Sequence, residues 1–163
     1  MDIKEICEYI ISNINESISV EQIASVFHYD KAYIMRKFKD YTGFTINEFV
    51  NECRVYNSTN PLIYTDDSIL KIALSNGFNS LEYYSEKFKD IIGSSPLKFR
   101  QIYSKLLLIA SKSKDAEELR LIKSALTELQ EYQIYLNSIG DNISIDNRKV
   151  SRPKVKTLNS IKK

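Results

Sequence analysis

A nine-residue phrase occurs twice in this chain, fifty residues apart. Residues 36–44 read RKFKDYTGF and residues 86–94 read EKFKDIIGS, and the two agree at five positions. Repetition at a fixed period indicates that one supersecondary unit is used more than once, which constrains the whole fold. We therefore expect two copies of one unit within the 163 residues.

The repeat extends upstream of this phrase and carries the signals of a helix followed by a turn. ISVEQIASVFHYDKAYIMRKF aligns with DSILKIALSNGFNSLEYYSEKF, and the offset changes from 49 to 50 residues at the turn. The second turn is therefore one residue longer. Ser19 and Gln22 form the pattern of a capping box, and Ser68 is the matching cap in the second copy. These caps predict where the first helix of each copy begins.

The turn residues predict a change of chain direction before a second helix. Gly77 supplies a position with positive φ. His28 lies near the same point of the first copy, and histidine tolerates that region better than most residues. Asp30 and Asn79 then offer side-chain oxygens that could cap the next helix.

The second helix of each copy is predicted to bury one apolar face. The spacing i, i+4, i+7 is met by Ile34, Phe38 and Tyr41 in the first copy and by Tyr84, Phe88 and Ile91 in the second. Gly43 and Gly93 follow, where a helix is expected to end. The apolar spacing near the start of the chain predicts one further helix, through Ile3, Ile6, Tyr9, Ile10 and Ile14. The sequence thus predicts an all-α domain with two tandem helix-turn-helix units.

Composition excludes several other classes of protein. Only 4 Gly and 3 Pro argue against a turn-rich all-β fold. Cys7 and Cys53 are too few and too isolated for a disulfide framework or a thiolate metal site, so we expect buried thiols in a reducing compartment. The opening MDIKEICEYI has charges within its apolar pattern and fits neither a signal peptide nor a membrane span. His28 is the sole histidine and no catalytic constellation accompanies it, so we expect no enzyme, metal or cofactor.

These motifs together resemble a known family. The order S-x-x-x-[LI]-A, turn, Y-x-x-x-F-K, G and then R, repeated and closed by GSSPLKFR, is similar to the AraC/XylS DNA-binding domain over residues 1–103. The resemblance implies that the second helix of each unit enters one of two successive major-groove segments on one DNA face. It also implies that a helix over 46–56 links the units, and that the protein is a cytoplasmic regulator of transcription. No segment resembles a ligand-binding domain.

We divide the chain accordingly into three parts. Residues 1–103 form the DNA-binding domain, with unit one at 1–55, including the start of the linker helix, and unit two at 56–103. Residues 104–140 are a helical extension, and residues 141–163 are a basic tail.

The outer face of the second helix in unit one is suited to DNA. Opposite its apolar face it presents Ala32, Met35, Arg36 and Lys39, with Lys31 at its start. Arg36 fits the O6/N7 edge of guanine or a phosphate, and Lys31 and Lys39 fit phosphates.

The corresponding face of unit two differs in charge. It presents Glu82, Ser85, Glu86 and Lys89, with Glu86 in the place of Arg36. A carboxylate can accept from cytosine N4, but two carboxylates at i, i+4 repel each other and the phosphates. We therefore expect unit one to dominate DNA binding.

The linker is expected to break at residues 57–61, which read NSTNP. Four poor helix formers and a proline favour an interruption, with Asn60 as a cap and Pro61 opening a new turn. Such a break could be a simple kink or a hinge between the units, and we favour the kink.

The extension leaves two interpretations open. Residues 115–139 predict a helix with an a/d-like apolar stripe made of Leu119, Ile122, Leu126, Leu129 and Leu136. Leu121, Ala125, Tyr132 and Tyr135 widen this surface. The stripe suits either a homodimer or packing against the chain's own domain.

Charge is unevenly distributed along the chain. Residues 1–103 hold 11 Lys+Arg and 14 Asp+Glu, a net of −3, although the whole chain is +2. The tail carries seven basic residues and no acid over 147–163, and we expect phosphate contacts from Arg148, Lys149, Arg152, Lys154 and Lys156. A solvated end is the alternative.

Two functions compete on this basis. The first is a sequence-specific transcriptional regulator that binds double-stranded DNA. The second is a degenerate module of the same fold that modulates another regulator or the transcription machinery by protein contact. The net −3 of residues 1–103 and the pair Glu82 and Glu86 are what favour the second.

Overall fold

A computed structural model describes residues 1–139, and all regular structure in that range is helical. Unit one contains α1 (Ile3–Ser12), α2 (Val20–Phe27) and α3 (Lys31–Thr42), followed by the linker α4 (Ile46–Tyr64). Unit two contains α5 (Ile69–Ser75) and α6 (Leu81–Ile92), and α7 (Pro96–Lys112) and α8 (Ala116–Ser138) complete the described part. The all-α prediction with two tandem units is confirmed.

The helix boundaries follow the local signals in the sequence. Ser19 and Gln22 form the predicted capping box, with reciprocal hydrogen bonds of 2.8 and 3.1 Å. His28 adopts the left-handed conformation that Gly77 adopts in the second copy, at φ of 57° and 83°. Gly43 ends α3 in the same conformation. The residues that the repeat marks therefore form the turn of each unit and the end of its second helix.

One predicted cap is displaced by the extra residue in the second turn. Asp30 caps α3 as expected, accepting from the Tyr33 N–H at 3.0 Å. In unit two the cap is Ser80, which accepts from the Tyr83 N–H at 3.1 Å, and not Asn79. The insertion falls after the turn hydrogen bond from Phe78 N–H to the Ala73 carbonyl, so Asn79 is the added residue.

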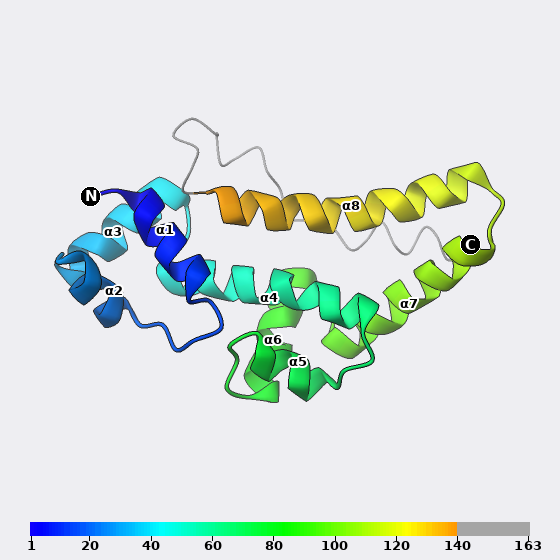
Figure 1. The fold of residues 1–163 in the computed structure, drawn as a ribbon, viewed down its shortest axis with the longest axis horizontal. Helices are drawn as coiled ribbons and strands as arrows, with labels where there is room; N and C mark the ends of the chain where they lie inside the picture. The colour runs from blue at the N-terminus through cyan, green and yellow to red at the C-terminus, as the bar shows by residue number, and fades with distance from the viewer. Residues whose placement is uncertain (140–163) are drawn as a thin grey trace.

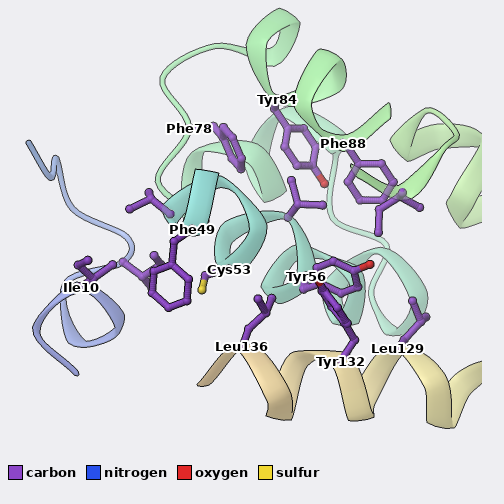
Figure 2. Packing of buried hydrophobic residues seen from close by; sticks show 14 of the residues in the cluster. Ile10, Phe49, Cys53, Tyr56, Phe78, Tyr84, Phe88, Leu129, Tyr132 and Leu136 are labelled. Atoms are coloured by element: carbon purple, nitrogen blue, oxygen red, sulfur yellow. The ribbon is translucent and has the colours of Figure 1, made fainter. Parts of the chain in front are cut away.

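The linker α4 lies at the centre of the molecule, and it packs against α1, α3, α5, α6, α7 and α8 (Figure 1). On α4, Phe49 packs against Phe38 of unit one and Ser58 contacts Tyr84 of unit two. Tyr56 of α4 packs against Tyr132 of α8 (Figure 2). The Tyr84 hydroxyl donates to Ser58 Oγ at 2.8 Å, and burial raises the Tyr84 pKa to about 12. One continuous apolar core therefore joins both units.

The predicted interruption of the linker is wrong, because α4 runs through residues 57–61 without a break. Pro61 costs the helix about 3 kcal/mol in isolation, because it lacks an N–H. Here tertiary burial outweighs that cost: Ser58 and Leu62 are fully buried. The hydroxyls of Ser58 and Thr59 donate to the carbonyls of Val55 and Tyr56, each at 2.6 Å. Ser58 and Thr59 thus satisfy their hydroxyls within the helix, and the hinge loses the break on which it depended. A simple kink stays a prediction.

The core face of each second helix is shifted slightly from the prediction. Ile34, Phe38, Tyr84 and Phe88 are fully buried as expected. The third position is taken by Thr42 and Ile92, which are buried, whereas Tyr41 and Ile91 are half-buried at the edge of the core. Thr42 is compatible with burial because its hydroxyl donates to the Phe38 carbonyl at 2.7 Å.

The helix α8 packs against its own domain, running back beside α4 (Figure 1). Ile122, Leu129 and Leu136 of the predicted stripe are buried there, together with Ala125 and Tyr132. Leu126 is half-buried and Leu119 is 37% exposed. Of the two interpretations, the stripe mostly serves intramolecular packing, and a homodimer stays a prediction.

Candidate nucleic-acid interface

The outer face of α3 brings together the side chains predicted to contact DNA. Lys31, Ala32, Met35, Arg36 and Lys39 are all exposed. The Arg36 guanidinium lies 5.8 Å from the centre of the Tyr33 ring, a cation–π distance that holds it beside the helix.

Lys31 is less available than the sequence suggested. Its ammonium group pairs with Glu21 of α2, and this hydrogen bond lowers the pKa of the Glu21 carboxyl. A phosphate would have to compete with that carboxylate for the lysine.

A hollow of about 410 Å³ lies between α3 and the start of α4. Four of the five predicted residues of α3 line it, namely Ala32, Met35, Arg36 and Lys39. The remaining lining comes from Val20, Asp40, Thr45, Ile46 and Asn47. No sequence pattern indicates this hollow, because its walls come from three helices.

The outer face of α6 keeps its acidic character. Glu82, Glu86 and Lys89 are exposed, whereas Ser85 is half-buried and less accessible than expected. Lys87 lies 3.4 Å from Glu86 and 3.8 Å from Asp90, so it offsets part of the negative charge. The two units therefore present surfaces of different electrostatic character.

Two arginines that were not assigned a site hold the units in place. Arg54 of α4 donates to the carbonyls of Ile14 and Glu16 at 2.8 and 2.7 Å. Arg100 of α7 repeats this in unit two, donating to the carbonyls of Leu62 and Thr65 at 3.1 and 3.3 Å. An arginine follows the closing glycine in each copy, but eleven residues after Gly43 and seven after Gly93, so the register of the repeat does not align the two.

Arg54 also reaches unit two. Its guanidinium lies 6.0 Å from the centre of the Phe78 ring. Asn51, one turn earlier on α4, donates to the Tyr83 hydroxyl at 3.0 Å. These contacts fix the position of α6 relative to the linker α4.

Metal ligands do not cluster within residues 1–139. No group of three His, Cys, Asp or Glu residues there could hold a metal ion. Cys7 and Cys53 are buried thiols, and burial raises the Cys53 pKa to about 12. The predicted tail contacts, Arg148, Lys149, Arg152, Lys154 and Lys156, lie outside the described residues.

No helix within residues 1–139 has both the length and the apolar character needed to cross a membrane.

Comparison with known proteins places this geometry in a family. Residues 23–102 match the family model of a helix-turn-helix domain. The probable transcription factor PqrA of Proteus vulgaris is 38% identical over 87 residues, which cover 53% of this chain and 71% of PqrA. An uncharacterised helix-turn-helix transcriptional regulator of Staphylococcus aureus is 29% identical over 98 residues, and the match spans only 13% of its length.

Solved structures share the fold. An AraC-type transcriptional regulator from Chromobacterium violaceum is 25% identical with a TM-score of 0.58, and the match covers 64% of this chain and 93% of that one. The DNA-binding domain of AdpA, solved with a target DNA, is 23% identical with a TM-score of 0.60, and the match covers 70% and 98% of the two chains.

The chain belongs to the AraC-type helix-turn-helix family. Its relatives carry the names of transcriptional regulators, which favours the DNA-binding function over the degenerate module.

Proposed function

We propose that this protein is a sequence-specific regulator of transcription that binds double-stranded DNA mainly through α3. The observation that carries the proposal is the outer face of α3, where Arg36 and Lys39 are exposed and line a mostly apolar hollow. Arginine is the side chain best matched to the guanine edge, and lysine to phosphate. The protein would act in the cytoplasm, where a bacterial-type regulator meets its DNA.

The second helix has a subordinate role in this proposal. With Glu82 and Glu86 exposed, α6 meets phosphates unfavourably, and Lys87 compensates for only part of that charge. Glu82 and Glu86 would accept from cytosine N4 where α6 meets a base edge, which gives selectivity with little added affinity. Lys89 is the one exposed cation among the α6 residues predicted to contact DNA.

The packing of α4 supports a fixed geometry for the two helices. The linker is unbroken, and Arg54 joins the loop of unit one to the Phe78 ring of unit two. A fixed spacing means that both half-sites lie at one separation on the duplex.

The test is selection from a pool of random duplexes with the full chain. The proposal predicts enrichment of one motif whose unit-one half contains a guanine, with binding that weakens as salt increases. A chain that enriches no motif, and that retains no random duplex at low salt, would overturn the proposal.

A further inference from the structure

The hollow beside α3 is mostly apolar, although it opens on a face that carries cations. Val20 from the first turn of α2 and Ile46 from the first turn of α4 contribute to its wall. Met35 and Ala32 also line the hollow and are exposed, Met35 by 45%. A small apolar group that contacts this wall removes apolar surface from water, which is favourable.

The charges around the hollow favour a base edge over a phosphate as its occupant. Arg36 and Lys39 line one part of it, but Asp40 lines it as well. A phosphate placed inside would meet that carboxylate and an apolar wall. A base edge brings no net charge, and of the four bases only thymine carries a methyl group into the major groove.

We propose that this hollow receives the C5-methyl group of a thymine, and that Met35 and Ala32 determine this preference. The inference rests on the proposed function and names the base that unit one selects beside the guanine of Arg36. The methyl group leaves water for contact with Ala32, Met35 and the wall formed by Val20 and Ile46. Apolar contact with this methyl is an established way to read thymine.

The test replaces thymine by deoxyuridine in the selected duplex, one position at a time. This change removes the methyl group and leaves the hydrogen-bonding edge intact. At the proposed position in the unit-one half, the affinity should fall about fourfold, the equivalent of one methylene-sized group returned to water. The same replacement in the unit-two half should leave the affinity unchanged.

Protein variants assign the effect to the hollow. Met35→Gln keeps the side-chain length but removes its apolar end, so the variant should bind the thymine and deoxyuridine duplexes equally. Leu108→Gln is the matched control, because Leu108 is an exposed apolar residue on α7 outside this face, and it should keep the fourfold preference.

Three results would overturn the inference: equal binding of both duplexes by the wild type, a Met35→Gln variant that keeps the preference, or a selected unit-one half without thymine. Each of these leaves DNA binding intact. Failure to select any duplex is a different result, because it overturns the proposed function and this inference with it.

Discussion

At the scale of single residues, Gly77 shows that a positive φ is only part of what a turn requires. His28 adopts the same conformation in unit one with a full side chain. A Cβ at Gly77 would lie 2.8 Å from both Arg54 Nε and the Ile14 carbonyl oxygen. Gly77 is therefore needed for the close approach of unit one to unit two, in addition to its backbone freedom.

Alanine at Gly77 should destabilise the protein more than alanine at Gly43. Both positions have positive φ, 83° and 81°, but nothing lies within 4 Å of a Cβ at Gly43. Gly43→Ala should cost about 1–2 kcal/mol of backbone strain. Gly77→Ala should cost about 1–3 kcal/mol more, because Arg54 and the Ile14 carbonyl must move. Urea unfolding of both variants measures the difference, and equal losses would show that Arg54 gives way freely.

At the scale of elements, α4 shows how tertiary packing overrides local propensity. The segment 57–61 has the sequence of a helix break, yet Ser58 and Thr59 are buried and their hydroxyls bond within the helix. A proline inside a helix still leaves the Asn57 carbonyl without its usual N–H donor four residues on.

Pro61→Ala should therefore stabilise the protein by about 1–2 kcal/mol. Alanine restores an N–H and has the best helix propensity, and this gain exceeds the ~0.4–1 kcal/mol lost because the unfolded chain becomes more flexible. Thermal unfolding should show a raised Tm. A lowered Tm would mean that the proline itself supports the packing of α4.

Two leucines of the α8 stripe separate intramolecular packing from dimerisation. Leu129 is buried and Leu119 is 37% exposed. Leu129→Ala should cost about 2–5 kcal/mol in urea unfolding, because it opens a cavity against α4, whereas Leu119→Ala should change stability by less than about 0.5 kcal/mol. Sedimentation of Leu119→Glu provides the control: conversion of a wild-type dimer into a folded monomer would show that the exposed part of the stripe is an interface.

Structural features that depend on a local sequence signal were predicted correctly, whereas features that depend on residues far apart in the chain were not. The capping box of Ser19 and the helix end at Gly43 depend on neighbours within a few residues, and both were predicted. The continuity of α4 through Pro61 depends on burial by elements far along the chain. The hollow beside α3 was missed for the same reason, since Val20 and Ile46 reach Met35 only in the folded state.

At the scale of the whole molecule, one fold presents two unequal surfaces. Both units have the same pair of helices, and an arginine anchors the chain next to each pair. Their outer faces differ in charge, with Arg36 in one unit and Glu86 in the other. Residues 1–103 carry a net charge of −3, so attraction to DNA within this part must come from local patches such as the face of α3.

Removing the acidic pair should reveal whether α6 meets DNA. The variant Glu82→Gln with Glu86→Gln should bind random duplex more tightly at low salt, because repulsion from the phosphates is relieved. It should bind the selected duplex less tightly if the carboxylates accept from cytosines. Anisotropy titrations with both duplexes check this, and unchanged affinity for both would show that α6 does not contact DNA.

The most direct measurement compares alanine at the two equivalent positions, Arg36 and Glu86, on the same selected duplex. If α3 dominates, Arg36→Ala should weaken binding by about 1–3 kcal/mol, and most of the loss should vanish on a duplex whose unit-one guanine is replaced. Glu86→Ala should leave the affinity unchanged or raise it slightly. Equal affinity of wild type and Arg36→Ala, or a larger loss for Glu86→Ala, would contradict a regulator that reads DNA mainly through unit one.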